Sequence, residues 1–304
     1  MTDQHHRILV TGANGFIGRE VCRVLIVHGY HIVATDRNAS ASMSTAYPFV
    51  EADVCDVDTL SDLCRTGHFD AIIHLASMRN RESQTRPADA LRVNIGASLT
   101  LLDLAAQYGI ARFVYGSSIS AYGPKPTAQH GEVAEIEPAA PGNVYGLGKR
   151  YVEMAGEQLQ RTGRLAFVAL RIAMVVGAGV VSTASMWRGE IFERLPIAQP
   201  CTIHLPYARD EVLPLIHVSA AAEMLHSLAA AAAPRHTIYN TPAEHWTCSD
   251  LANAVAAINP SVTFTFVPSG VRGDPEKIDG RRFQNEMACS VQSIHEQMRL
   301  AIRQ

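Results

Sequence analysis

The feature that most constrains the fold is a glycine-rich segment near the N-terminus, with the spacing G-x-x-G-x-x-G over Gly12, Gly15 and Gly18. An apolar, β-branched run at residues 7–11 precedes it, and a helical pattern follows at 16–28. In this context the first glycine permits a tight turn, the second lets the backbone approach a pyrophosphate, and the third lets the helix pack closely on the strand. The helix start also offers unpaired N–H groups to phosphates. The segment therefore predicts a dinucleotide-binding site.

Apolar strand patterns alternate with amphipathic helices along the first half of the chain. This alternation predicts an α/β fold, a Rossmann-like doubly wound parallel sheet with a small, discontinuous C-terminal substrate lobe. The expected strands after the first are at 31–35, 71–76, 113–116 and 165–170, and the main helices are at 90–108, 144–162 and 219–233. We expect a cofactor-binding core over 1–177 plus about 213–234, and a substrate-binding lobe over about 178–212 and 235–304.

Composition excludes several classes of partner. The 304 residues contain 26 basic and 29 acidic side chains, a net charge of −3, which gives no reason to expect nucleic acid or an anionic membrane as partner. The polar N-terminus lacks a secretory signal, and no apolar run approaches the ~18 residues of a membrane span. Six widely spaced cysteines indicate reduced thiols, so we expect a cytoplasmic protein. The 13 histidines show no metal-binding spacing, and no metal is expected.

Asp36 closes the second expected strand, where a carboxylate accepts hydrogen bonds from an adenosine ribose. A carboxylate there repels a 2′-phosphate, which favours NAD over NADP. Arg37 follows it, and a guanidinium could accommodate that phosphate, so NADP stays as the less favoured cofactor. Asp53 and Val54 follow a short apolar segment and either hold the adenine edge or form a strand-end turn.

Tyr145 and Lys149 open an expected helix, and a spacing of four places them on one helix face. A tyrosine titrates near ~10, too high for a base at neutral pH, but a nearby ammonium lowers that pKa. The pair can therefore exchange a proton with a carbinol during hydride transfer. Ser117 and Ser118 end a strand, where a hydroxyl could orient the substrate or simply form a turn.

These residues resemble the extended short-chain dehydrogenase/reductases, the NAD-dependent epimerase/dehydratase family. The matching segments are Thr11 to Gly18, His74 to Ala76, Ser117 to Gly123, and Tyr145 with Lys149 and Glu153. The resemblance implies a sheet of about seven parallel strands, catalysis by Ser118, Tyr145 and Lys149, Asn94 near the cofactor, and a homodimer packed through helices 90–107 and 145–161. In the family's serine motif the catalytic hydroxyl lies four residues before a tyrosine, here Tyr122, which selects Ser118. The predicted cofactor-binding residues are Gly12, Asn14, Gly15, Phe16, Ile17, Gly18, Asp36, Arg37, Asp53, Val54, Leu75, Ala76, Ser77, Asn94, Tyr145 and Lys149.

Two departures from the family pattern bear on the reaction. Dehydratases that this chain resembles carry Asp-Glu after the catalytic hydroxyl, where Ile119 and Ser120 stand here, and neither supplies a general acid or base. Nucleotide-sugar epimerases usually carry an Asn where Met174 stands, and a thioether cannot donate that hydrogen bond. The first departure argues against dehydration, and the second argues against a UDP- or dTDP-linked sugar, which leaves a smaller substrate.

The stretch 180–188 is similar to the substrate segment of relatives that oxidise free sugar acids. A carboxylate substrate needs a guanidinium, and Arg188 and Arg79 are the candidates, although either could be an ordinary surface charge. The predicted substrate-binding residues are Ser77, Arg79, Ser118, Ile119, Met174 and Arg188. We therefore expect an NAD-dependent oxidoreductase of a small sugar, sugar acid or hydroxy acid. The alternatives are a nucleotide-sugar epimerase with tightly bound NAD and a non-catalytic NAD-sensing protein.

Overall fold

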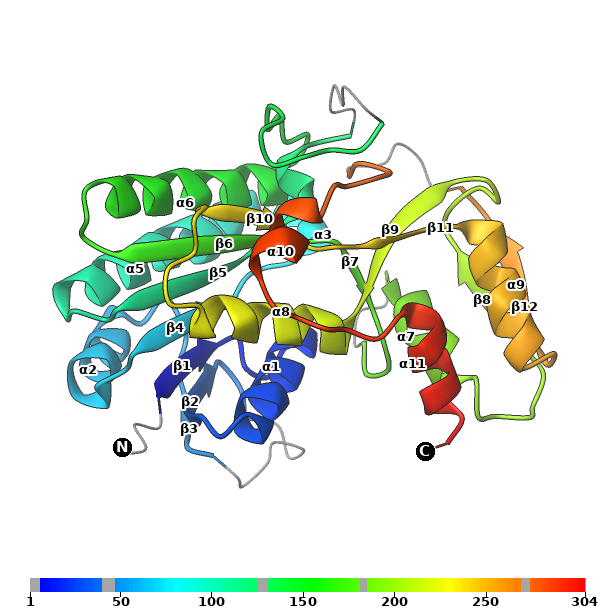
Figure 1. Cartoon of the computed structure of the whole chain (residues 1–304), viewed down its shortest axis with the longest axis horizontal. Helices are drawn as coiled ribbons and strands as arrows, with labels where there is room; N and C mark the ends of the chain where they lie inside the picture. Colours follow the sequence, from blue (N-terminus) through cyan, green and yellow to red (C-terminus); the bar gives the residue numbers. More distant parts are fainter. Residues whose placement is uncertain (1–5, 40–46, 125–130, 181–184, 269–273, 304) are drawn as a thin grey trace.

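A computed structural model describes residues 6–39, 47–124, 131–180, 185–268 and 274–303. Its centre is a seven-stranded sheet with the order β10-β6-β5-β4-β1-β2-β3, and every neighbouring pair is parallel (Figure 1). The strands are β1 (Arg7–Thr11), β2 (His31–Asp36), β3 (Phe49–Glu51), β4 (Ala71–His74), β5 (Arg112–Ser118), β6 (Ala166–Ile172) and β10 (Ile238–Asn240). The predicted doubly wound parallel sheet is confirmed.

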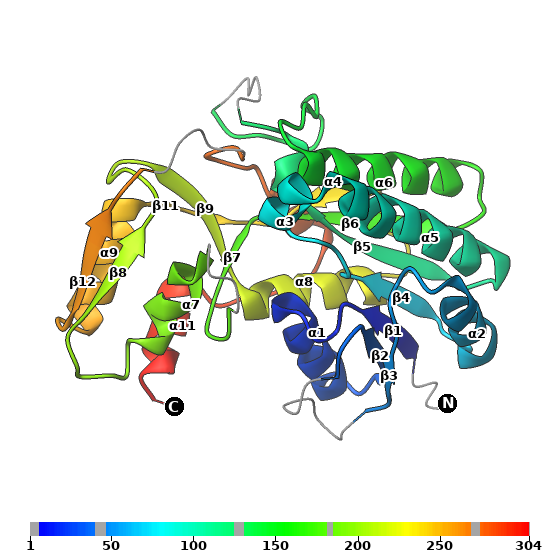
Figure 2. The same ribbon diagram turned by 180° about the vertical axis from the view of Figure 1, so that it is seen from behind.

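Helices cover both faces of this sheet, as Figures 1 and 2 show. One face carries α1 (Phe16–Val27) and α8 (Val218–Ala230), which share a hydrophobic cluster with the sheet. The other carries α2 (Val57–Gly67), α5 (Ser98–Gln107) and α6 (Val144–Arg161), which share a second cluster. The strands read as continuous apolar runs because both of their faces are buried. Three short segments precede α5: α3 (Asn80–Thr85), α4 (Pro87–Ala90) and the π-helix η1 (Leu91–Ala97).

A second lobe has its own hydrophobic cluster, which includes Trp187, Leu251 and Met298. It contains a three-stranded sheet of β11 (Glu244–Thr247), β9 (Val212–His217) and β7 (Met174–Val176). It also contains the parallel pair β12 (Val262–Phe266) and β8 (Cys201–Leu205). Its helices are α7 (Trp187–Glu193), α9 (Cys248–Ile258) and α11 (Ile294–Ala301). This lobe lies beside the carboxyl ends of β5 and β6 (Figure 1).

The expected boundaries between the two parts differ from this arrangement in two places. The strand β10, expected in the substrate lobe, adds an edge to the central sheet, and Phe283 of α10 (Arg281–Glu286) packs edge-on against its Tyr239. Conversely β7 and β9, expected in the core, pair with each other in the second lobe. Apolar runs of three to six residues look alike in sequence, and tertiary pairing decides which sheet they join.

No helix in the described part of the chain is long and apolar enough to cross a membrane. The polar N-terminal residues 1–5 lie outside the described residues.

Candidate active site

The glycine segment forms the tight connection between β1 and α1. Gly12 has a φ of 70°, and a Cβ there would lie 2.5 Å from the backbone nitrogen of Ala76. A Cβ on Gly18 would lie 2.1 Å from the carbonyl oxygen of Gly12. Gly15 is the exposed N-cap of α1, so the first N–H groups of that helix are available to a ligand. Phe16 and Ile17 pack partly against the core.

Asp36 lies at the end of β2, with its carboxylate turned toward the glycine segment. Its Oδ2 accepts a hydrogen bond from the backbone N–H of Asn14 at 3.0 Å, and its Oδ1 accepts from the N–H of Arg37 at 2.7 Å. The buried Oδ1 of Asn14 has no partner among the described residues. The carboxylate and the unsatisfied acceptor fit the hydroxyls of a dinucleotide's ribose, and the helix N-terminus beside them fits its phosphates.

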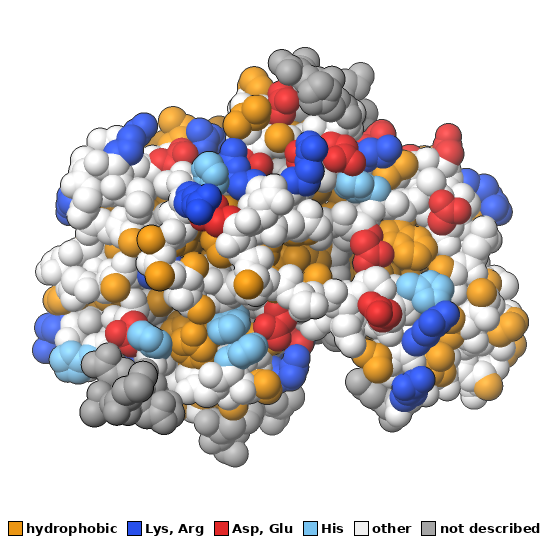
Figure 3. Space-filling view, viewed as in Figure 1, with side chains coloured by type: hydrophobic (Ala, Val, Ile, Leu, Met, Phe, Trp, Pro, Cys, Tyr) orange, Lys and Arg blue, Asp and Glu red, His pale blue; other side chains and the backbone are white. Residues whose placement is uncertain are grey.

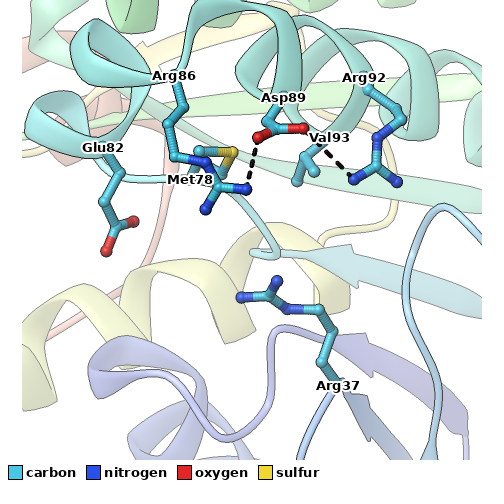
Figure 4. Close-up of a pocket in the computed structure, with 7 residues that line it drawn as sticks. All are labelled: Arg37, Met78, Glu82, Arg86, Asp89, Arg92 and Val93. Carbon is cyan, nitrogen blue, oxygen red and sulfur yellow. Dashed lines mark ion pairs between the residues drawn. The ribbon is translucent and has the colours of Figure 1, made fainter.

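Arg37 extends from the same strand end toward α3, α4 and η1. Figure 4 shows its guanidinium facing Met78, Arg86 and Asp89 across a cavity of about 140 Å³. Asp53 accepts a hydrogen bond from the N–H of Cys55 at 2.8 Å, and Val54 is buried in the second cluster. The geometry of Asp53 is therefore that of a turn.

A buried hydrogen-bond network fixes the loop after β4. The hydroxyl of Ser98 donates to the carbonyl of Asn94 at 2.9 Å and lies 2.9 Å from Nε2 of His74. The Nδ1 of His74 lies 2.6 Å from the hydroxyl of Thr11. Burial, aided by the charge of Lys149, lowers the pKa of His74 to about 3. His74 is therefore neutral. Because the Ser98 hydroxyl donates its hydrogen bond to Asn94, it can only accept from His74, so the ring proton of His74 is on Nε2.

The Asn94 side chain holds the same loop from η1. Its Oδ1 accepts from the N–H of Met78 at 2.6 Å, and its Nδ2 donates to the carbonyl of Met78 at 3.0 Å. The partly exposed Leu75, Ala76 and Ser77 lie along the loop between His74 and this contact. Asn94 thus positions the loop, and its amide is largely occupied in doing so.

Tyr145 and Lys149 lie in the first turns of α6, where Asn143 caps the helix by accepting from the N–H of Gly146 at 2.8 Å. A Cβ on Gly146 would lie 2.2 Å from the carbonyl oxygen of Ser120. This close approach brings the start of α6 against the end of β5. Tyr145 consequently lies close enough to Ser118 for that residue to lower its pKa.

Lys149 is buried beneath Tyr145. Its ammonium donates to the carbonyl of Gly116 at 2.6 Å and lies 4.6 Å and 5.5 Å from the ring centroids of Tyr115 and Tyr145. Ser117 donates to Glu153 at 2.6 Å, and Glu153 accepts two hydrogen bonds from Arg171, at 2.7 and 2.9 Å. Because Ser117 is engaged in this way, Ser118 is the strand-end hydroxyl that faces Tyr145.

The sequence-based expectation for the pKa of Tyr145 is wrong for the protein alone. Burial raises the pKa of Tyr145 to about 12, although the neighbouring Ser118 and the charge of Arg188 oppose the rise. Burial lowers the pKa of Lys149 to about 7, against the attraction of Glu153. Lys149 points its ammonium at the carbonyl of Gly116 and is itself desolvated. Its charge therefore does not counteract the rise that burial causes in the pKa of Tyr145.

Sequence reasoning missed Asp274. Ser118 donates to the hydroxyl of Ser120 at 3.2 Å, and Ser120 donates to the carboxylate of Asp274 at 2.5 Å. The Asp274 charge also raises the pKa of Tyr145. Ser120 is therefore coupled to an acid that lies 154 residues away in the chain. No motif marks Asp274, because only the fold brings it to β5.

The predicted substrate residues fall into two groups. Arg188 lies in α7, its buried Nε has no partner among the described residues, and its charge acts on Tyr145. Arg79 instead pairs with Glu82 at 2.7 Å on the surface. Ile119 and Met174 are packed in hydrophobic clusters, so neither side chain is brought to the site as expected. Residues 181–184 of the expected substrate segment lie outside the described residues.

One further contact joins the glycine segment to the chain that follows β7. Arg19, in the first turn of α1, donates to the carbonyl of Asn14 at 2.8 Å and to the carbonyl of Gly179 at 3.0 Å. It ties the glycine segment to the chain just after β7.

Comparison with known proteins gives one family. The NAD dependent epimerase/dehydratase family model matches residues 8–241. The UDP-glucose 4-epimerase of Azospirillum brasilense is 33% identical over 185 residues, which are 59% of this chain and 52% of that protein. The UDP-glucose 4-epimerase of Caenorhabditis elegans is 35% identical over 136 residues, 38% and 39% of the two chains. The chain thus spans about half the length, or less, of the curated relatives it matches.

Solved structures share the fold over the whole chain. An L-threonine dehydrogenase from Cupriavidus necator superposes with a TM-score of 0.87 at 21% identity, covering 97% of this chain and 99% of that one. The UDP-glucose 4-epimerase of Thermotoga maritima gives a TM-score of 0.83 at 22% identity, covering 98% and 97%. At these identities the likeness establishes the fold alone.

The burial of Lys149 should lower the free energy of unfolding by an amount that depends on pH. Its pKa is about 7 in the folded protein and about 10.5 for an unperturbed lysine, so between these values the unfolded chain binds a proton that the folded one does not. Stability should therefore rise with pH across this window, and Lys149→Met should remove the rise. Thermal unfolding of both proteins between pH 6 and 10 checks this. The variant should gain most relative to the wild type near pH 6, and a difference that is constant with pH would contradict the assignment.

Proposed function

Because this chain belongs to the NAD dependent epimerase/dehydratase family, we propose that it is a dehydrogenase that moves a hydride between NAD and a hydroxyl of a small sugar, sugar acid or hydroxy acid. Membership confirms the predicted family and NAD as its cofactor. The observation that carries the proposal is the placement of Tyr145 beside Ser118, with its ring centroid 5.5 Å from the ammonium of the buried Lys149, at the carboxyl end of β5. That edge is where open parallel sheets bind ligands.

The residues that would hold NAD are the glycine segment, Asn14 and Asp36 on the phosphate and ribose side, with Lys149 toward the reacting end. When bound, NAD supplies a hydride acceptor and a positively charged ring. Ser118 orients the substrate hydroxyl, and Tyr145 takes its proton in oxidation or returns it in reduction. Tyr145 must be a phenolate to take that proton, and the charge of Arg188 favours this form against the effect of burial.

The proton transfer predicts a clear result for Tyr145→Phe. Turnover should fall by about 100-fold or more, the usual contribution of a general acid or base, while NAD affinity stays nearly unchanged. Oxidation by the wild type should also accelerate as the pH rises above neutrality, because the pKa of Tyr145 is about 12 and its basic form becomes more populated. Initial rates against pH, with NAD binding followed by fluorescence, measure both. Near-normal turnover by the variant would remove Tyr145 from the mechanism.

A carboxylate on the substrate is the feature that the pocket supports best. The buried Nε of Arg188 has no partner among the described residues, and its guanidinium is 5.6 Å from the Trp187 ring, which limits its movement. A guanidinium with an unsatisfied donor near Tyr145 suits the carboxylate of a hydroxy acid. Asp274, linked to Ser118 through Ser120, offers an acceptor to a further hydroxyl of the same substrate.

Arg188→Met should raise KM for acidic substrates by about 10- to 100-fold, the value of a lost charged hydrogen bond, and change KM for neutral polyols little. Arg79→Met is the matched control, because Arg79 forms a surface ion pair and should alter neither. Steady-state kinetics on an acid and on the corresponding neutral polyol measure the two KM values for each variant. An equal effect of the two substitutions would exclude Arg188 from carboxylate recognition.

A second candidate is a nucleotide-sugar epimerase that retains NAD. The observation in its favour is that the curated relatives described above are UDP-glucose 4-epimerases. An epimerase returns the hydride and forms no net NADH, whereas a dehydrogenase forms it in proportion to product. The apolar Met174 and its burial in the second lobe favour the dehydrogenase. A purely NAD-sensing role would not require Ser118, Tyr145 and Lys149 to be assembled.

We also propose a cytoplasmic homodimer. The six cysteines are all free thiols, which supports a reducing compartment.

Leu147, Tyr151 and Met154 follow one face of α6 and are more than half exposed, as is Leu91 before α5. An apolar face of this kind supports packing against a second copy.

Met154→Asp should shift the protein from dimer to monomer, because an unpaired charge in an interface is costly. Ile136→Asp, at another exposed apolar position, should not. Sedimentation velocity of both variants measures the shift, and a dimer that survives Met154→Asp would place the interface elsewhere.

A further inference from the structure

A second group of chemically active side chains lies away from the site described above, where α1 packs beside α8. His28 is the C-cap of α1, and Glu223 and His226 lie three residues apart on one face of α8. Figure 3 shows histidine and acidic side chains gathered on the surface over α8. The nearby Arg23 is engaged by Glu20 through two hydrogen bonds, at 2.7 and 3.0 Å.

The three side chains point their ligating atoms at one another. Nε2 of His28 lies 3.1 Å from Oε2 of Glu223, and Nδ1 of His226 lies 3.7 Å from the same oxygen. All three atoms fall within 4.8 Å of one another. In a tetrahedral zinc site, bonds of about 2.0–2.2 Å place neighbouring ligand atoms about 3.3 Å apart. Small rotations of these side chains would therefore bring them to the spacing of a metal site.

The packing around the histidines restricts their rings. The rings of His28 and His226 stack with centroids 4.0 Å apart, and Tyr30 packs edge-on against His226 at 5.3 Å. Two positively charged imidazolium rings this close would repel each other, so at least one of the two rings favours its neutral form. A neutral imidazole has a nitrogen lone pair that can bind a metal. The single carboxylate gives the cluster a negative charge. Two imidazoles and one carboxylate are a ligand set suited to zinc and its neighbours in the first transition row.

We propose that His28, Glu223 and His226 form a binding site for a divalent transition metal of the zinc type, which cross-links the end of α1 to α8. Water completes the coordination, because the side chain of His28 is 41% exposed and leaves the site open on one side. The Glu-x-x-His spacing on α8 presents two ligands on one face, as metal-binding helices do. The site does not depend on the proposed reaction. The sequence gives no signal for it, because His28 and Glu223 are 195 residues apart.

The test uses the full-length protein, freed of any affinity tag and stripped of metal with a chelator. Zinc is titrated by calorimetry, and cobalt by the visible absorption that tetrahedral Co²⁺ acquires with nitrogen ligands. We expect one equivalent of zinc to bind and the melting temperature to rise by about 5 °C at saturation. Failure to bind zinc or cobalt overturns the proposal.

Three substitutions assign the binding to this cluster. His226→Ala and the near-isosteric Glu223→Gln should each weaken zinc binding about 100-fold or more, beyond the loss seen when only outer-shell partners are removed. His28→Gln serves in case His226→Ala folds poorly, since His28 is exposed. His68→Asn, at an exposed histidine elsewhere, is the control and should bind as the wild type does. Binding that survives these changes but disappears in His6→Ala would assign the metal to the N-terminus and overturn the proposal.

Discussion

The buried ion pair between Glu153 and Arg171 is the interaction on which the arrangement of the candidate active site depends. Both side chains are almost completely buried, and two hydrogen bonds join them. Glu153 also accepts from Ser117, so one carboxylate connects α6 to both β5 and β6. A buried pair of this kind adds little net stability, but loss of one partner costs about 3–5 kcal/mol because the other charge is left unpaired. Its effect here is on geometry. The ion pair holds α6 against the sheet in the position in which Tyr145 lies next to Ser118, one residue beyond Ser117.

The same network reaches the edge of the sheet and the lysine. The guanidinium of Arg171 lies 4.4 Å from the ring centroid of Tyr122, whose hydroxyl donates to Asn240 of β10 at 2.8 Å. Glu153 also opposes the loss of charge at the buried Lys149. A second network, through His74 and Asn94, holds the loop after β4 on the other side of the site. The proposed cofactor side and the proposed catalytic side are thus each fixed by buried polar groups with defined partners.

Local signals in the sequence were sufficient for the parts that depend on local structure. The glycine segment, the carboxylate at the end of β2, and the spacing of Tyr145 and Lys149 each follow from one turn, one strand end or one helix face. Features that arise from packing between distant segments were not predictable. The strand β10 is only three residues long and joins the sheet through β6, and Asp274 reaches Ser120 across 154 residues. The raised pKa of Tyr145 likewise follows from burial, which the spacing of residues does not reveal.

Net oxidation is the central claim, and following NADH formation by its near-ultraviolet absorbance tests it most directly. The assay runs with NAD, and in parallel with NADP, over aldonic acids, uronic acids, polyols and 2- or 3-hydroxy acids. We expect NADH to accumulate in proportion to product with one class of acid, and to form faster from NAD than NADPH does from NADP. A flat trace across the whole panel, from protein that binds NAD and interconverts a nucleotide sugar, would contradict a dehydrogenase and establish an epimerase.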